Sequence, residues 1–298
     1  MNMVINLNKP KNISSQQAVL KVKRLFAARK AGHAGTLDPM ATGVLIVCLN
    51  EATKITRFLS NLDKEYIVRL KLGERTDTYD AAGRIIEKTK CPSFTKADIL
   101  GILDNFIGRI KQIPPMYSAI KLGGQPLYKL ARKGMNVTRP ERTINIYAIE
   151  LVSLDLPYID LKVLCSKGTY IRTLCDDIGK ALCIGAHMVS LERLRIGTFR
   201  IEDSASIEDI CSKKDAHHSI DAAISHLREI ILDEDSYHKA RNGVPIAISG
   251  IPLCPPLVKG DVGGLYINQY VRLKGPENNL LGIGWVESDR IKIERLLD

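Results

Sequence analysis

A glycine-rich loop that runs directly into a buried strand most restricts how this chain can fold. Residues 31–43 read Ala-Gly-His-Ala-Gly-Thr-Leu-Asp-Pro-Met-Ala-Thr-Gly, and an apolar run at 44–48 follows at once. The length and branching of that run predict a buried strand. Glycines allow a backbone to approach a ligand closely, and Pro39 disfavours a helical conformation for Asp38. The sequence therefore predicts a tight loop that presents Asp38 immediately before a buried strand.

The remaining pattern predicts an α+β protein. Ser14 and Ser15 can cap a helix that extends to about Lys30, and Thr95 with Asp98 resembles a capping box. We expect strands at 65–72, 144–154 and 159–165, and helices at 51–60 and about 169–183. From about residue 233, short apolar runs alternate with Gly, Pro and Asn, which is typical of a small β-rich module. We therefore expect domains at 1–232 and 233–298, the first with a mainly antiparallel sheet flanked by helices.

The charge distribution predicts a polyanionic partner. The chain has 43 basic and 33 acidic residues among 298, a net charge of +10. Residues 1–37 contain no acid, so that Asp38 is the first carboxylate, and residues 109–142 contain only Glu141. Two solvated faces are the alternative interpretation. Two basic blocks around a glycine loop favour a groove that follows phosphates, in which cations keep Asp38 ionised as a nucleophile or base.

The cysteines and the apolar runs exclude several other classes. Seven cysteines form no C-x-x-C pair, which indicates reduced thiols. Cys183 and His187 could share a helix face with Cys175 nearby, but zinc needs more ligands, and core packing is the better interpretation. No apolar run is long enough to cross a membrane. We expect a cytoplasmic protein with no metal site.

Six motifs in series resemble the TruB family, the transfer-RNA pseudouridine-55 synthases. The first is the loop at 32–45, and the others together extend the resemblance over roughly residues 1–200. They are Asp-Lys-Glu-Tyr at 63–66, Gly-Glu-Arg-Thr-Asp-Thr-Tyr-Asp-Ala-Ala-Gly at 73–83, Pro-Pro-Met-Tyr-Ser-Ala at 114–119, Leu-Ala-Arg-Lys-Gly at 130–134 and Lys-Gly-Thr-Tyr-Ile-Arg at 167–172.

The resemblance implies a role for each matched residue. It makes Asp38 the catalytic carboxylate, Arg172 its ion-pair partner, and Tyr66 the tyrosine that stacks on the target uracil. It further implies substrate contacts for His33, Asp80, Tyr170 and Leu191, with His33 filling the gap that an extruded base leaves. Taken alone, each of these residues could instead be an ordinary loop, core or surface residue. Candidate phosphate contacts are Lys9, Lys129, Arg132 and Lys133.

The resemblance also implies a fold, a reaction and a partner. The fold is of the pseudouridine synthase type with a small PUA-like C-terminal domain. The reaction needs no cofactor, because it breaks and remakes one base–sugar bond without net redox change. The expected partner is the T-arm of tRNA, bound by a monomer that requires neither a protein partner nor a membrane. The alternatives are an RNA-binding or RNA-folding protein, a guide-RNA-dependent synthase subunit and a nucleobase hydrolase.

Overall fold

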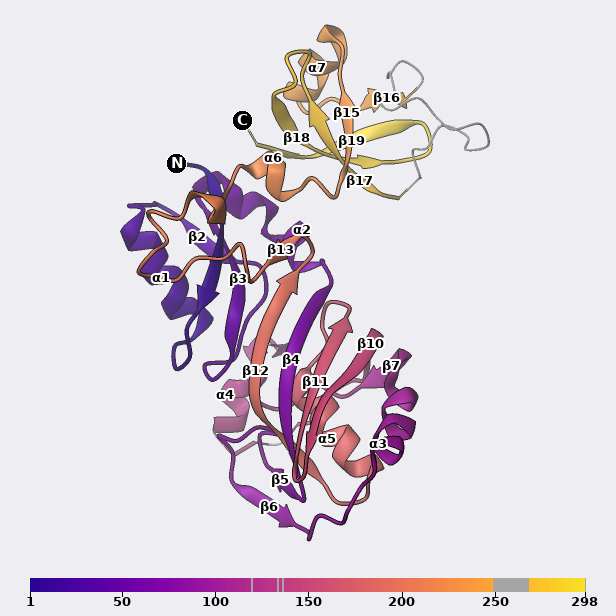
Figure 1. Ribbon diagram of the computed structural model, residues 1–298. Helices are drawn as coiled ribbons and strands as arrows, with labels where there is room; N and C mark the ends of the chain where they lie inside the picture. The colour runs from indigo at the N-terminus through magenta and orange to yellow at the C-terminus, as the bar shows by residue number, and fades with distance from the viewer. Residues whose placement is uncertain (119, 133, 136, 249–267, 298) are drawn as a thin grey trace.

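A large mixed sheet and a smaller β-rich unit make up the molecule (Figure 1). The computed structural model describes residues 1–118, 120–132, 134–135, 137–248 and 268–297. The large sheet has the strand order β14-β1-β3-β12-β4-β11-β10-β7, with β2 paired to β3 and β13 paired to β12. Its described pairs are antiparallel except β12 with β3, whose short parallel contact joins the two halves of the sheet. The expected mainly antiparallel α+β fold is confirmed.

The strands of the large sheet carry Tyr66 and Leu191, and two of them, β2 and β3, flank the loop that holds Asp38. Alternating burial along β4 turns Tyr66, Val68, Leu70 and Leu72 toward the core, as the sequence predicts. The strands are β1 (Met3–Lys9), β2 (Ala31–His33), β3 (Thr42–Leu49), β4 (Lys64–Leu72), β7 (Gly108–Gln112), β10 (Arg142–Asp155), β11 (Tyr158–Cys165), β12 (Ala186–Ile196), β13 (Phe199–Arg200) and β14 (His217–His218).

Helices cover one face of this sheet. Helix α1 (Ser15–Leu25) lies against β2 and β3, α5 (Ile171–Ala181) lies against β12, and α3 (Lys96–Leu103) contacts α5 and β10. Ser14 and Thr95 form the capping boxes of α1 and α3. Helix α1 ends at Leu25 rather than near Lys30, because Ala27 adopts a left-handed conformation with φ 45°.

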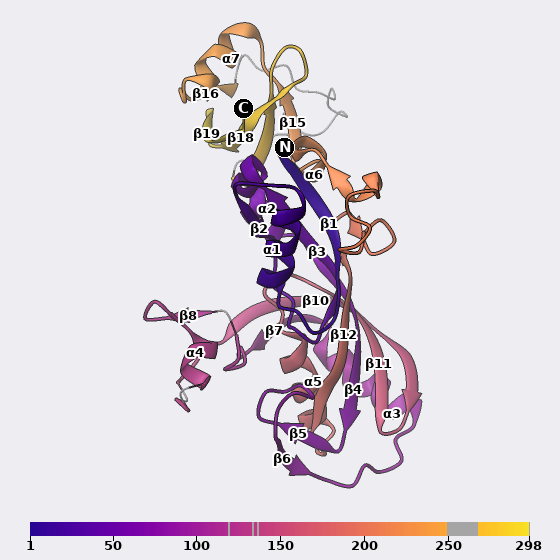
Figure 2. The same cartoon turned by 90° about the vertical axis from the view of Figure 1, so that its left-hand side faces the viewer.

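Short elements join the larger ones. The predicted helix at 51–60 is a 3₁₀ turn, η1 (Asn50–Ile55), that continues into α2 (Thr56–Ser60). The hairpin of β5 (Glu74–Thr76) and β6 (Ile85–Lys88) lies at one end of the sheet. Two further 3₁₀ turns are η2 (Asp104–Phe106) and η3 (Lys214–Ala216). Between β7 and β10, an arm at 113–141 projects from the body with β8 (Lys121–Leu122), β9 (Gln125–Pro126) and α4 (Leu127–Arg132) (Figure 2).

The C-terminal unit has its own sheet and core. Its strand order is β15-β17-β18-β19-β16, and the pair of β15 with β17 is parallel. Because β15 belongs to this sheet, the small unit begins before residue 233, where the change of pattern in the sequence suggested a boundary. Its elements are β15 (Arg228–Ile231), α7 (Glu234–Arg241), β16 (Ile246–Ala247), β17 (Tyr270–Lys274), β18 (Leu280–Val286) and β19 (Arg290–Leu296), preceded by α6 (Ile220–Ala223).

Apolar and charged contacts join the small unit to the large sheet. Phe58 of α2 packs edge-on against Tyr270 with ring centroids 4.9 Å apart, and Ile283 belongs to the same buried cluster as Phe58. Arg57 pairs with Glu294 beside these rings. Within the described residues, no helix is long and apolar enough to span a membrane.

Candidate active site

The loop between β2 and β3 holds Asp38 in a fixed position. The Ser15 hydroxyl of α1 accepts a hydrogen bond from the Leu37 N–H at 2.8 Å and lies 3.0 Å from the Leu37 carbonyl. The Ala41 N–H donates to the Asp38 carbonyl at 3.0 Å. The first turn of α1 therefore fixes the residue beside Asp38, whose side chain remains 30% exposed. A rigid loop with one accessible carboxylate suits a group that meets a substrate.

Arg172, in the first turn of α5, holds the Asp38 carboxylate. Its Nε lies 2.9 Å from Oδ2 of Asp38, and its Nη2 donates to Oδ1 at 3.1 Å. Nη2 also donates to the Tyr117 carbonyl at 2.7 Å, and Nη1 lies 3.4 Å from both the Asp80 carboxylate and the Thr78 carbonyl. All five N–H groups of the guanidinium thus have acceptors. The predicted ion pair is confirmed, and its two-point geometry fixes the orientation of the carboxylate.

Asp80 is the second carboxylate of this network. It is buried beside Arg172, and its Oδ1 accepts hydrogen bonds from the Thr78 hydroxyl at 2.7 Å and the Ala82 N–H at 3.1 Å. Asp38 is therefore not isolated from other acids in space, although it is isolated along the sequence. Asp80 shares the positive charge of Arg172 with Asp38, and it fixes the far side of the guanidinium.

Burial decides the pKa of Asp38. Burial raises the pKa of this carboxyl, while Arg172 and, more weakly, Lys9 lower it, and the negative charge of Asp80 raises it further. The net pKa lies above the ordinary aspartate value. The cations that the sequence predicted around Asp38 thus offset its desolvation only in part. A carboxylate with a raised pKa is the better general base near neutral pH.

Tyr66 and Leu191 lie on the neighbouring strands β4 and β12, and both are 7% exposed. Tyr66 lies opposite Arg193 in β12, and Leu191 lies opposite Val68. Burial raises the pKa of Tyr66, Arg193 lowers it, and Asp38 is close enough to raise it slightly. The fold thus places both predicted residues on the core-facing side of the sheet, with Tyr66 in the electrostatic environment of Asp38.

Arg193 is a site residue that the sequence did not predict. It is 1% exposed, and it donates from Nε to the Val44 carbonyl at 2.7 Å and from Nη2 to the Gly35 carbonyl at 3.0 Å. These carbonyls lie on either side of Asp38 along the chain, so one guanidinium ties the two ends of the loop together. Gly43, with φ 98°, is required because a Cβ there would lie 2.3 Å from the Arg193 carbonyl oxygen. No recognisable pattern marked Arg193 in the sequence, where it is one of several arginines near 193–200.

His33 and Tyr170 lie at the borders of the site. His33 ends β2 and is therefore part of a strand rather than of the loop. Burial and the neighbouring Arg193 lower the pKa of His33, which keeps the ring neutral and suited to stacking. Tyr170 immediately precedes α5, and burial raises the pKa of its hydroxyl.

The structure corrects the role of Lys9. This side chain is 0% exposed, and its ammonium donates to the carbonyls of Pro10 and Ile13 at 2.9 Å and of Pro39 at 3.4 Å. Burial lowers the pKa of Lys9 to about 8. Lys9 therefore supports the chain next to Asp38 and cannot reach a phosphate. The position of Lys9 in the sequence, after an apolar strand and before a proline, did not indicate that its side chain is buried.

The other three candidate phosphate contacts belong to the arm. Lys129 is exposed on α4. Arg132 ends that helix, and Lys133 lies outside the described residues. On the described part of the arm, Lys129 thus remains a candidate phosphate contact.

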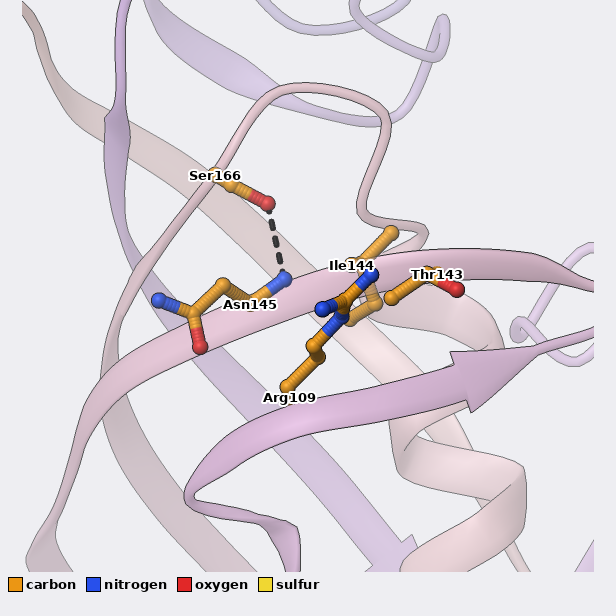
Figure 3. A pocket seen from close by; sticks show the side chains of 5 residues that line it. All are labelled: Arg109, Thr143, Ile144, Asn145 and Ser166. Carbon is orange, nitrogen blue, oxygen red and sulfur yellow. Dashed lines mark hydrogen bonds between the residues drawn. The ribbon is translucent and has the colours of Figure 1, made fainter.

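Two other places in the molecule, the suggested metal ligands Cys183 and His187 and a hollow on the surface, are poorer candidates for an active site than the Asp38 loop. Cys183 lies in a turn after α5 while His187 lies on β12, where its Nδ1 is 2.9 Å from the Glu74 carbonyl, so these two residues do not share a helix face. A surface hollow between β7, β10 and the loop before α5 contains a single cation and no acid (Figure 3). Its lining consists of Arg109, Thr143, Ile144, Asn145 and Ser166.

The site thus consists of an aspartate that Arg172 holds at two points and an inward-facing tyrosine, Tyr66, on a mixed sheet. A solved structure described as a Cbf5-Nop10-Gar1 complex superposes with a TM-score of 0.77 at 25% identity, over 99% of this chain and 85% of that one. Another, of an H/ACA RNP bound to a substrate RNA containing 2′-deoxyuridine, gives 0.74 at 24% identity, over 99% of this chain and 85% of that one. The second likeness shows the fold alone.

The sequence comparisons show the family. Residues 23–171 match the model of the TruB family pseudouridylate synthase N-terminal domain, and residues 172–237 match the tRNA pseudouridylate synthase B C-terminal domain. The tRNA pseudouridine synthase B of Clostridium tetani is 43% identical over the full length of both chains. That of Serratia proteamaculans is 39% identical over 99% of this chain and 94% of its own. The chain belongs to the TruB family of pseudouridylate synthases.

Proposed function

We propose that this enzyme isomerises uridine 55 in the T-loop of tRNA to pseudouridine. The observation that carries the proposal is the partly exposed Asp38 carboxylate, which Arg172 holds at two points beside the inward-facing Tyr66. Relatives that match the chain along its whole length are named tRNA pseudouridine synthase B, which supports tRNA as the substrate.

The reaction uses these groups without net redox change. The bond from uracil N1 to the ribose C1′ breaks, the base turns, and a bond forms from C5 to C1′. The proton on C5 leaves for solvent, and N1 gains one. Asp38, ionised and oriented by Arg172, is the group that assists the breaking and remaking of the base–sugar bond. Tyr66 stacks on the base, and Leu191 and Asp80 complete its surroundings.

The target base must leave its stack before it reaches Asp38. Extrusion costs on the order of a few kcal/mol of lost stacking. His33 is a neutral flat ring at the end of β2, five residues before Asp38, and it can occupy the place of the extruded base. Phosphate contacts from the exposed basic residues of α1 and the arm then supply a salt-dependent share of the affinity for tRNA.

The enzyme acts as a monomer.

Position-specific tRNA transcripts test this proposal. A transcript with uridine at position 55 is incubated with the enzyme, and pseudouridine is mapped by carbodiimide modification and primer extension. We expect one stop, which reports pseudouridine at position 55 and falls one nucleotide to its 3′ side, and none in a matched transcript that carries cytidine at position 55. A stop at another position alone would refute the proposed target. A folding role without catalysis predicts binding of both transcripts and no stop in either.

A further inference from the structure

The first turn of α5 lacks a capping side chain of its own. Tyr170 is the residue before the helix and provides no side-chain hydrogen bond to the first turn. Instead, the Gln112 side chain, at the end of β7 and 2% exposed, binds the main chain of Tyr170 at two points. The Tyr170 N–H donates to Oε1 of Gln112 at 2.7 Å, and Nε2 of Gln112 donates to the Tyr170 carbonyl at 3.0 Å. One buried amide thus holds the peptide groups two residues before Arg172.

The chain after Gln112 makes further contacts with the same helical turn. The Tyr117 carbonyl accepts from Nη2 of Arg172 at 2.7 Å, and the Thr173 hydroxyl lies 3.5 Å from the Ile113 carbonyl. Gln112 therefore contacts the helix start at Tyr170, and the base of the arm contacts it at Arg172 and Thr173. These contacts set the direction in which the guanidinium leaves α5.

A second pair of hydrogen bonds fixes the other end of the loop that leads into α5. The Asn145 N–H donates to the Ser166 hydroxyl at 2.9 Å, as Figure 3 shows, and the Ser166 N–H donates to the Asn145 carbonyl at 2.8 Å. With Ser166 held on β10 and Tyr170 held by Gln112, the short loop is anchored at both ends. Only the Gln112 anchor adjoins Arg172.

We propose that Gln112 is a positioning residue for catalysis, which holds the start of α5 so that Arg172 keeps its two-point contact with Asp38. This inference rests on the proposed function of the Asp38 site. A glutamine suits the task because one amide donates and accepts at once, as a peptide pair needs. An apolar side chain of the same length would fill the space but leave the Tyr170 N–H without its partner, and the Tyr170 carbonyl would keep only the Leu174 N–H at 3.1 Å. The helix start would then shift so that the N–H finds a new partner.

The test compares Gln112→Met with wild type and with Thr95→Ala. Methionine conserves shape and removes both hydrogen bonds, whereas Thr95→Ala weakens the capping box of α3, away from the site. Steady-state kinetics on tRNA labelled at C5 of uridine give kcat and KM across pH. Because a displacement of about 1 Å can lower a rate on the order of 100-fold, we expect kcat to fall about 10- to 100-fold in Gln112→Met, with KM within about threefold. Thr95→Ala should match wild type.

The pH profile separates positioning from a general loss of structure. The charged groups that face Asp38 are Arg172, Lys9 and Asp80. When Arg172 loosens, its lowering of the Asp38 pKa weakens while the Asp80 charge remains, so the acid limb of the profile should move to higher pH in Gln112→Met. An unmoved acid limb, or kcat within twofold of wild type, would overturn the inference.

Two further measurements keep the inference testable if Gln112→Met does not fold or if the proposed function fails. Gln112→Asn keeps the amide but is one methylene too short to reach both Tyr170 groups, and wild-type kcat in this variant would refute the positioning role. The Nε–H resonance of Arg172 in ¹⁵N-labelled protein, assigned by its loss in Arg172→Lys, reports the ion pair without turnover. It should shift in either Gln112 variant and stay in place in Thr95→Ala, and an unshifted resonance would refute the inference even if the enzyme modified a different RNA.

Discussion

Replacing Arg172 by lysine removes the two-point hold on Asp38 while it keeps the positive charge. The guanidinium donates twice to Asp38, once to the Tyr117 carbonyl, and weakly to Asp80 and the Thr78 carbonyl. An ammonium has three donors that radiate from one atom, so it cannot serve both oxygens of Asp38 and a carbonyl on the opposite side. Lysine at this position therefore leaves Asp38 charged but free to rotate.

The expected size of the effect follows from the hydrogen bonds that lysine cannot make. One hydrogen bond to a charged group contributes about 1.5–3 kcal/mol. If lysine keeps one bond to Asp38 and forgoes the second, with the difference expressed in the transition state, kcat should fall about 10- to 150-fold at roughly 1.36 kcal/mol per decade. KM should change little, because uniform binding of the RNA does not depend on this pair.

Tritium release from tRNA labelled at C5 of uridine measures this fall in rate. Arg69→Lys is a matched control, because Arg69 makes the same two-point pair with Asp160 at 2.7 Å but lies on the exposed side of β4. We expect the Arg69 variant to turn over like wild type. If Arg172→Lys retained a rate within threefold of wild type, the positive charge alone would suffice for catalysis and the two-point geometry would not be needed.

The same site leads us to expect three further results. The acid limb of the pH–rate profile should lie above the ordinary aspartate pKa, because burial raises the pKa of Asp38. Asp80→Asn should move this limb to lower pH, because it removes a charge that raises the Asp38 pKa. A shift to higher pH would contradict the assignment of the acid limb to Asp38. Lys9→Met should lower the free energy of unfolding by about 1–3 kcal/mol in urea titrations and leave the salt dependence of tRNA binding unchanged. Lys129→Ala should instead reduce the slope of log K against log salt by about 0.7–0.9. A reduced slope in Lys9→Met and an unchanged slope in Lys129→Ala would restore Lys9 as a phosphate contact. His33→Ala should slow turnover of folded tRNA more than of a flexible-loop RNA, and equal slowing would remove its stacking role.

Much of the fold followed from local sequence signals. The alternation at 65–72, the apolar run at 44–48, the cap at Ser14 and the capping box at Thr95 are each decided by neighbouring residues, and the structure confirms them. Element ends depended on single backbone conformations, such as the left-handed Ala27 that ends α1 early. The extent of the small unit could not be predicted, because β15 joins it through a parallel pair with β17, a strand far along the chain.

The site shows the same division between local and long-range information. The glycine loop and the acid-free stretch before it marked Asp38, whereas Arg172, 134 positions away, was marked only because the chain resembles a family. Arg193, Gln112 and the true role of Lys9 depend on buried hydrogen bonds to distant main-chain carbonyls. Composition and periodicity carry no signal for such bonds, since a buried arginine and an exposed one look alike in a sequence.

The most direct test of the central claim compares tritium release by the wild type and by Asp38→Asn from tRNA labelled at C5 of uridine. Asparagine keeps the size of the side chain and removes its negative charge, and tRNA binding by both proteins is measured in parallel. We predict release by the wild type and none by Asp38→Asn, with binding retained in both. Release by both proteins, or binding by both without any release, would contradict catalysis by the Asp38 carboxylate.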